Sequence, residues 1–235
     1  MNDLKVKIYS DGANVDDMVS ADSQNLVDGF TTNPTLMAKA GIKDYLGFAK
    51  EVLSKIKEKS ISFEVFSDDI DEMYDQAMSL KALGDNVFIK IPVSNTKQEY
   101  TYDLIHRLSH ENVKLNITAL FTKEHVDNVY NSLKKGVPSI ISIFAGRIAN
   151  TGIDPEPIME YAVNLTKDEE EFEILWASSR EVFNIIQAER TGTHIITLSP
   201  SLISSMKDLN KDLDEYSLDT VKMFYNDALN AGYKL

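Results

Sequence analysis

The sequence predicts a single (β/α)8 barrel, in which eight parallel strands alternate with helices packed around them. Two observations lead to this fold class. Short runs typical of β-strands recur at intervals of about 25–30 residues, the length expected of one strand–helix unit. Between them lie amphipathic stretches with helical periodicity, and a repeated strand–helix unit requires parallel strands with the helices outside. Eight such units account for the whole chain.

The eight strand-like runs are short, apolar and rich in β-branched residues. They begin at Val6, Gly29, Ile61, Asn86, Val113, Pro138, Phe172 and His194. Helical stretches such as DIDEMYDQAMSLKAL and EYTYDLIHRLSHE follow them, with apolar residues three and four positions apart and acidic or hydroxyl residues near their starts. The segment SLDTVKMFYNDALNAGYKL at the end of the chain predicts a further amphipathic helix, which could dock on its own barrel or on a neighbouring copy.

No linker or low-complexity segment interrupts this rhythm, so we expect residues 1–235 to form one barrel domain with a C-terminal amphipathic helix. The alternative is an open doubly wound sheet, which would carry a glycine-rich nucleotide-binding turn after its first strand. That turn reads DGANVDD and contains no GxGxxG motif. The barrel is therefore the preferred prediction.

Composition excludes several classes of function. A net charge of −13 argues against nucleic acid or an anionic membrane as a partner, because both polyanions require a basic surface. No run approaches the roughly 18 apolar residues of a membrane span, and MNDLKVKIYSDGA lacks the apolar core of a secretory signal, so we expect a cytoplasmic protein. The absence of cysteine excludes disulfides and thiolate metal sites. His106 and His110 have a metal-like spacing but no third ligand, so we expect no metal site.

Polar residues gather where the predicted strands end, which is where barrel enzymes place their active groups. Alternation puts Phe88, Lys90 and Pro92 on the interior face of the fourth run, with Lys90 its polar exception. The same rule assigns other residues to the interior or the mouth: Tyr9, Asp11, Asn116, Thr118, Ser142, Phe144, Trp176, Ser178 and Arg180, with Glu64 in the middle of the third run. Each alone could be a cap or a surface group, but their convergence on successive strands indicates a site.

At these residues the sequence resembles the transaldolase family, and in particular its short members, which include the fructose-6-phosphate aldolases. The matching segments run in family order through nearly the whole chain: IYSD, GFTTNPTL, VFIKIPV, LNITALF, SIFAGRI, ASSR and HIITLSP. The resemblance implies a (β/α)8 fold, sugar-phosphate substrates, self-association, and a class I aldol mechanism that needs neither a metal nor an organic cofactor.

The resemblance also implies catalytic roles. Lys90 matches the lysine that forms the Schiff base, and Asp11 matches the carboxylate that moves protons at a sugar hydroxyl. Glu64 and Thr118 match the pair that holds the water used in forming and breaking the imine. A lysine attacks only when neutral, and we expect burial beside Phe88, Ile89 and Ile91 to favour the neutral amine.

Binding roles follow in the same way. The residues matched to the sugar chain are Asn33, Asn116 and Ser142; those matched to the phosphate are Arg147, Ser178 and Arg180. From the sequence, a helix beginning near Glu181 would aim its backbone N–H groups at the same phosphate. Two departures from the family put substrate identity in doubt: Gly12 after Asp11, where threonine is common, and the loop IANTGIDP after Arg147.

The resemblance leaves the reaction open between two outcomes. Within the family a glutamate at the position of Glu64 and a phenylalanine at that of Phe144 accompany transfer, whereas glutamine and tyrosine accompany plain aldolase activity. We therefore expect a transaldolase, with a fructose-6-phosphate aldolase that releases dihydroxyacetone as the alternative. A sugar-phosphate-binding barrel without catalysis is the third possibility.

Overall fold

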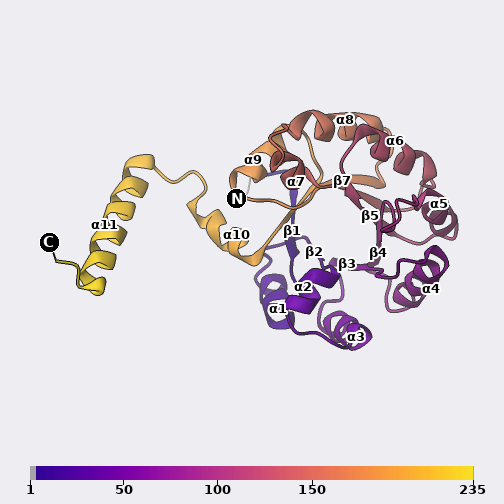
Figure 1. Cartoon of the computed structure of the whole chain (residues 1–235), viewed down its shortest axis with the longest axis horizontal. Helices are drawn as coiled ribbons and strands as arrows, with labels where there is room; N and C mark the ends of the chain where they lie inside the picture. The colour runs from indigo at the N-terminus through magenta and orange to yellow at the C-terminus, as the bar shows by residue number, and fades with distance from the viewer. Residues whose placement is uncertain (1–3, 235) are drawn as a thin grey trace.

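The chain forms a closed barrel of eight parallel strands joined in sequence order, which confirms the predicted fold class (Figure 1). The computed structural model describes residues 4–234. The strands are β1 (Lys7–Asp11), β2 (Gly29–Thr31), β3 (Ser60–Glu64), β4 (Val87–Pro92), β5 (Leu115–Leu120), β6 (Ser139–Ile143), β7 (Phe172–Trp176) and β8 (Ile195–Leu198). Closure leaves no sheet edge, and it brings the carboxyl ends of all eight strands to one mouth.

Helices surround the barrel and follow each strand. They are α1 (Val15–Ser23), α2 (Pro34–Lys39), α3 (Tyr45–Lys55), α4 (Ile70–Lys81), α5 (Tyr102–His110), α6 (Lys123–Ser132), α7 (Ala145–Ala149), α8 (Glu156–Thr166), α9 (Phe183–Arg190), α10 (Pro200–Ser205), the 3-10 helix η1 (Met206–Asp208) and α11 (Leu213–Ala231). Asn14, Asp44, Asp69 and Thr122 cap their helices with side-chain oxygens. Of the two stretches expected to start near a cap, α4 has one in Asp69, whereas Thr101 before α5 makes no capping hydrogen bond. No helix in residues 4–234 is long and apolar enough to cross a membrane.

The core has two layers, because alternate residues of each strand point outward and inward. Ile89 and Ile91 belong to the large cluster that packs the strands against the helices. Phe88 packs inside the barrel with a smaller cluster of Tyr9, Ile140, Leu175, Ala177 and Ile195. The predicted alternation in β4 is therefore confirmed, and Lys90, which shares its face with Phe88, points into the barrel.

The predicted facing of Trp176 was wrong. Trp176 is fully buried in the outer cluster against the helices, whereas its neighbours Leu175 and Ala177 belong to the interior cluster. Ser178, two residues further on, has φ of 66°, which lies in the left-handed region. Ser178 and Arg180 do line the cavity at the mouth of the barrel. They reach it through this turn and not through the strand alternation from which their position was predicted.

Helix α11 stands away from the barrel, beyond α10 (Figure 1). None of its residues is buried, and its exposed apolar side chains include Leu218, Val221, Tyr225 and Leu229. These four follow one another at spacings of three and four residues, so they share one face of the helix. The C-terminal segment is helical, and it does not pack on its own barrel, which was one of the two docking modes left open.

Candidate active site

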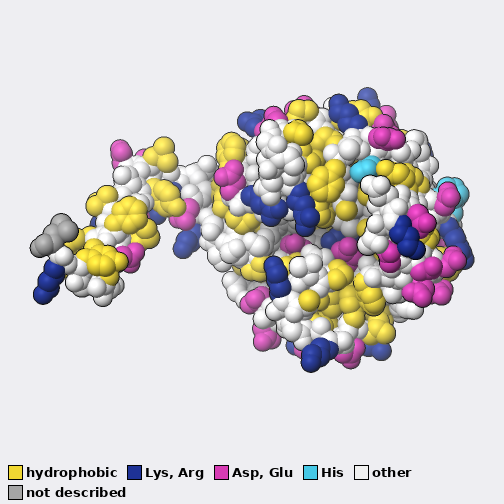
Figure 2. Space-filling view, in the orientation of Figure 1, with side chains coloured by type: hydrophobic (Ala, Val, Ile, Leu, Met, Phe, Trp, Pro, Cys, Tyr) yellow, Lys and Arg dark blue, Asp and Glu magenta, His cyan; other side chains and the backbone are white. Residues whose placement is uncertain are grey.

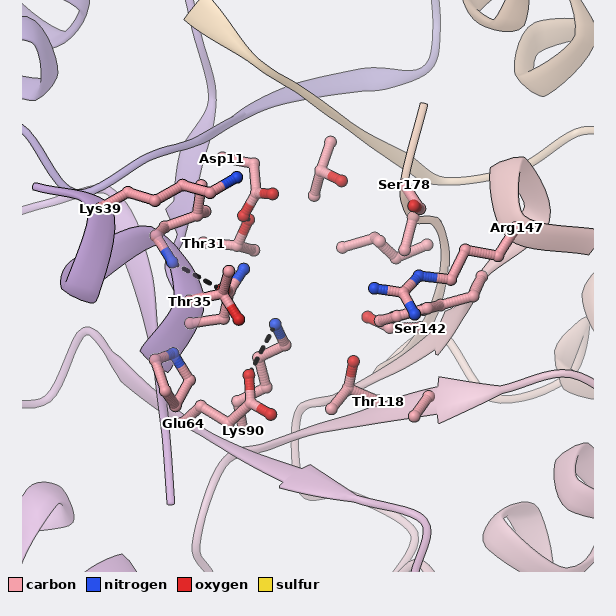
Figure 3. A pocket seen from close by; sticks show the side chains of 18 of the residues that line it. Asp11, Thr31, Thr35, Lys39, Glu64, Lys90, Thr118, Ser142, Arg147 and Ser178 are labelled. Atoms are coloured by element: carbon pink, nitrogen blue, oxygen red, sulfur yellow. Dashed lines mark hydrogen bonds and ion pairs between the residues drawn. The ribbon is translucent and has the colours of Figure 1, made fainter. Parts of the chain in front are cut away.

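A cavity of about 490 Å³ opens at the carboxyl ends of the strands (Figure 3). Its lining includes ten of the eleven residues that the sequence nominated: Asp11, Asn33, Glu64, Lys90, Thr118, Ser142, Phe144, Arg147, Ser178 and Arg180. Figure 2 shows the hollow at the centre of this face, with basic side chains gathered around it. A local positive rim is thus present on a chain whose net charge is −13, as an anionic ligand requires.

Lys90 lies deep in this cavity and is only 7% exposed. Its Nζ is 3.0 Å from Oε2 of Glu64 and donates to the backbone oxygen of Thr32 at 3.3 Å. The β3–β4 register places Glu64 directly beside Lys90, so the pairing follows from the barrel itself. The expectation that Ile89 and Ile91 surround the amine was wrong, because both face the helices. A carboxylate within proton-transfer distance is the main neighbour of the amine.

Asp11 ends β1 and lies in the same cavity. Its Oδ1 accepts a hydrogen bond from Oγ1 of Thr31 at 2.8 Å. Burial raises the pKa of the Asp11 carboxyl above its ordinary value, against the opposing effects of the Lys90 charge and the Thr31 hydrogen bond. A carboxyl group whose pKa is raised can both take up and release a proton, which suits general acid–base chemistry.

Thr118 contributes a hydroxyl without a partner. Its Oγ1 is buried and makes no hydrogen bond within residues 4–234, although the residue lines the cavity. The next residue, Ala119, has φ of 63°, and the pairing of β5 with β6 shifts register between Ile117 and Leu120. A buried hydroxyl that lacks a partner marks a place for a polar group of a ligand or for water.

A chain of buried polar side chains links β3, β5 and β6 inside the barrel, beside Lys90. The Ser142 hydroxyl donates to Oδ1 of Asn116 at 2.6 Å, and Nδ2 of Asn116 donates to Oγ of Ser62 at 2.9 Å. Asn116 is fully buried and does not line the cavity, which corrects its expected place among the residues that face the sugar. It orients Ser142, which does face the cavity.

Asn33 has a structural task in addition to its place in the cavity. Its Oδ1 accepts from the backbone N–H of Leu36 at 3.0 Å, so the side chain caps α2. This cap, followed by Pro34 in the first turn, explains locally why the GFTTNP segment leaves β2 and enters a helix at the mouth. The cap also fixes the position of Asn33 at the cavity rim.

Three cationic side chains form the rim. Arg147 comes from α7 and stacks on Phe144, with Cζ 5.3 Å from the ring centroid, while Arg180 follows β7. Lys39, at the end of α2, reaches into the cavity from the side opposite Arg147 (Figure 3). All three are positioned by segments that follow strands, which is where barrels carry their binding groups.

The expected backbone contribution to this anion site was wrong. Helix α9 begins at Phe183, and the N–H groups of Arg180 and Glu181 donate to Oδ1 of Asn184 at 2.8 and 3.2 Å. These N–H groups are therefore used inside the protein rather than turned toward an anion. The polar side chains that face the cavity here are those of Arg147, Ser178 and Arg180, with Lys39 opposite.

Several polar residues of the site were not predicted from the sequence: Thr31, Lys39, Ser62 and Thr197. Alternation could have found Thr31, which pairs with Asp11 across β1 and β2, and Ser62, which precedes Glu64 by two residues in β3. Lys39 carries no such signal, because its reach depends on how α2 folds over the mouth. Residues 4–234 contain no group of three or more His, Asp or Glu side chains that could hold a metal ion.

Comparison with known proteins identifies the family. The model for "Transaldolase/Fructose-6-phosphate aldolase" matches residues 8–234. The chain belongs to this family. Its members are class I aldolases of carbohydrate metabolism, so the protein is an enzyme of that group.

Several relatives are similar over most of their length. A probable transaldolase of Thermoanaerobacter sp. (strain X514) is 32% identical over 202 residues, which are 86% of this chain and 89% of the relative. A probable transaldolase of Ruegeria sp. (strain TM1040) is 30% identical over 235 residues, covering 98% of this chain and 100% of the relative. At this level of identity the relatives do not separate transaldolase from aldolase activity.

Solved structures support the fold alone. An N-acetylneuraminate lyase from Mycoplasma synoviae superposes with a TM-score of 0.54 at 12% identity, covering 97% of this chain and 82% of the lyase. KGPDC from Streptococcus mutans gives a TM-score of 0.57 at 10% identity and covers 85% of this chain and 90% of that protein.

Proposed function

We propose that the protein is a transaldolase, which transfers a dihydroxyacetone unit from a ketose phosphate such as fructose 6-phosphate to an aldose phosphate through a Schiff base on Lys90. The observation that carries this proposal is the buried Lys90 amine, held 3.0 Å from the Glu64 carboxylate in a cavity that also holds Asp11 and a cationic rim. Nucleophile, proton carriers and anion-binding groups then occupy one space. The cytoplasmic location expected from the sequence stays a prediction.

The reaction begins with proton transfer from Lys90. Glu64 takes the proton directly or through a water held with the Thr118 hydroxyl, and the neutral amine attacks the ketose C2 carbonyl. Loss of that oxygen as water forms the imine, and the protonated imine then withdraws electrons from the C3–C4 bond. Asp11 takes the proton from the C4 hydroxyl as this bond breaks. An aldose phosphate leaves, and a three-carbon enamine stays on Lys90.

The second half runs in reverse with a new aldehyde. The enamine carbon attacks the acceptor carbonyl, Asp11 returns its proton to the new hydroxyl, and water hydrolyses the imine to release the product ketose. Hydrolysis of the enamine before an acceptor arrives would release dihydroxyacetone instead. Glu64 and Phe144, the residue types that accompany transfer in the family, support slow hydrolysis and therefore transaldolase activity.

Turnover of fructose 6-phosphate is expected to depend on an acceptor aldehyde such as erythrose 4-phosphate. Without an acceptor the enamine persists on Lys90, so the enzyme releases glyceraldehyde 3-phosphate only once and then stalls. The measurement is the rate of glyceraldehyde 3-phosphate release with and without the acceptor, together with the amount of free dihydroxyacetone. Equal rates in the two assays would replace the transaldolase proposal with the aldolase alternative.

Removing the guanidinium of Arg147 or Arg180 is expected to weaken the reaction of phosphorylated substrates selectively. The loss of a charge-assisted contact and of some positioning should raise the activation free energy that governs kcat/KM for fructose 6-phosphate by roughly 2–4 kcal/mol. This corresponds to a decrease in kcat/KM of roughly 30- to 1,000-fold. Substrates without a phosphate, such as fructose or dihydroxyacetone, should lose far less. The measurement is kcat/KM for both substrate types in Arg147→Ala and Arg180→Ala.

The matched control is Arg107→Ala. Arg107 pairs with Glu111 on the outside of the barrel and does not line the cavity, so its removal tests the loss of a positive charge alone. If the two cavity variants lose activity equally on both substrate types, or resemble Arg107→Ala, these arginines do not bind the phosphate.

We also propose that residues 1–235 form one barrel domain with a C-terminal helix.

A second proposal is that α11 is covered by another copy of the chain in a homo-oligomer. The support is the face formed by Leu218, Val221, Tyr225 and Leu229, which the barrel leaves exposed. A continuous apolar face of this kind is unusual on the surface of a monomer. Replacing Val221 and Tyr225 by serine is expected to reduce the mass measured by light scattering. A wild-type chain that is monomeric at micromolar concentration would contradict the proposal.

A further inference from the structure

The segment that carries Ser178 and Arg180 is packed unusually closely against α7. The N–H of Gly146 donates to the backbone oxygen of Ala177 at 3.2 Å. A Cβ on Gly146 would lie 1.7 Å from the backbone oxygen of Ser178, a distance that no side chain could tolerate. Because only glycine allows this approach, the backbone just before Arg180 is fixed relative to α7.

Asn184 holds the same segment from the other side. Asn184 is only 6% exposed, and its single Oδ1 accepts both the Arg180 and the Glu181 N–H groups. Its Nδ2 donates to Oε1 of Gln187 at 2.8 Å, and Gln187 in turn donates to Glu156 at 3.0 Å. Asn184 is therefore part of a chain of hydrogen bonds that leads from the cavity loop to α8.

Asn150, which directly follows α7, reaches the other end of Arg180. The Asn150 amide has one orientation that satisfies the hydrogen bonding of both Arg180 and Gly146. In it, the amide oxygen accepts a hydrogen bond from Nη2 of Arg180 at 3.2 Å. In this orientation the amide nitrogen donates to the backbone oxygen of Gly146 at 3.1 Å. The guanidinium is thus tied to the same α7 segment as the backbone that precedes it.

We propose that Asn150 and Asn184 are positioning residues that hold Arg180 in a phosphate-binding orientation and thereby set the preference for phosphorylated substrates. Asn184 fixes the backbone of Arg180, and Asn150 fixes its guanidinium, so a long side chain at the cavity rim is ordered before the substrate arrives. An arginine that is already ordered loses less conformational entropy when it binds an anion. This inference rests on the proposed phosphate-binding role of Arg180.

The test is the ratio of kcat/KM for fructose 6-phosphate to kcat/KM for fructose in Asn150→Ala and Asn184→Ala. Each variant is expected to lower this ratio about tenfold, mainly through a higher KM for the phosphorylated substrate. Asn184→Asp retains an oxygen acceptor for both N–H groups but loses the donor to Gln187, so it should lower the ratio less than Asn184→Ala does. Asn164→Ala is the matched control, because Asn164 only donates to a backbone oxygen within α8.

Repeating Asn150→Ala in the Arg180→Ala background separates positioning from other effects. If Asn150 acts through Arg180, its loss changes nothing further once Arg180 is gone. A second tenfold loss in that background, or a ratio in Asn150→Ala equal to that of Asn164→Ala, overturns the inference. If Arg180→Ala itself leaves the ratio unchanged, the proposed phosphate site fails and this inference fails with it. If Arg180→Ala lowers the ratio and both asparagine variants leave it unchanged, only the positioning role fails.

Discussion

Replacing Lys90 by alanine is expected to lower kcat by roughly 10⁴-fold or more, because removing the nucleophile abolishes the covalent route and leaves only binding. The folded barrel should survive, since the side chain ends in the cavity and not in either apolar cluster. Steady-state assays with fructose 6-phosphate and erythrose 4-phosphate measure the loss, and circular dichroism verifies the fold.

Lys90→Arg separates charge from nucleophilicity. The guanidinium can still pair with Glu64, but it stays protonated and cannot attack a carbonyl, so this variant should be as inactive as Lys90→Ala. Lys7→Ala is the matched control, because Lys7 also comes from a barrel strand and pairs with a glutamate, Glu173, at 2.8 Å, yet lies outside the cavity. Retention of more than about a hundredth of the wild-type kcat in Lys90→Arg would count against the Schiff-base mechanism.

Asp11→Asn is expected to lower kcat by roughly 10²–10⁴-fold, the usual contribution of a general acid or base. The amide keeps an oxygen acceptor for Thr31 but cannot carry a proton during cleavage of the carbon–carbon bond. The loss should appear in kcat, with substrate binding largely retained. A variant that keeps full kcat would show that another group moves this proton.

The same substitution is expected to make the protein more stable at neutral pH. Because the folded state raises the pKa of Asp11, ionisation of this group costs the folded state free energy at every pH above the raised value. Below the ordinary pKa of an aspartate both states are protonated, so the cost and the gain from Asn disappear. Tm should therefore rise at pH 7, by roughly 2–4 °C per kcal/mol for a chain of this size, and not near pH 3. A lower Tm at pH 7 would contradict this account.

The barrel and most of its cavity were predictable because they depend on local patterns. The strand–helix rhythm predicts eight units, and alternation within a regular strand predicts which side chains share the interior. Lys90 with Phe88 in β4 shows this clearly. Asp11 and Ser142 follow the same rule at the ends of their strands. These inferences need only the period of a strand and the closure of the sheet.

The errors arose where the backbone leaves regular geometry. Trp176 was placed on the same face as Ser178 and Arg180, but regular alternation ends at the positive φ of Ser178, and within β7 Trp176 shares the outer face of Phe172 and Ile174. Glu181 was expected to start a helix, but the side chain of Asn184 captures the N–H groups that precede α9. This contact is local, but its acceptor follows the N–H groups in the chain, whereas an N-cap precedes them, so the usual capping signals do not predict it.

Other features depend on parts of the molecule that are distant in sequence. Asn116 was expected to face the sugar, but its side-chain amide is hydrogen-bonded to Ser62 and Ser142, which belong to two other strands. Helix α11 has an apolar face that its periodicity reveals, yet periodicity does not say which surface covers it. The position of the helix away from its own barrel is a property of the connection after η1.

The most direct test of the central claim is reduction of the enzyme with borohydride in the presence of fructose 6-phosphate, followed by peptide mapping. Borohydride reduces an imine to a stable amine, so the substrate carbons become permanently attached to the lysine that formed it. The account predicts a reduced three-carbon or ketose adduct on Lys90 and the loss of this adduct in Lys90→Ala. An adduct on another cavity lysine such as Lys39, with Lys90 unmodified, would contradict it.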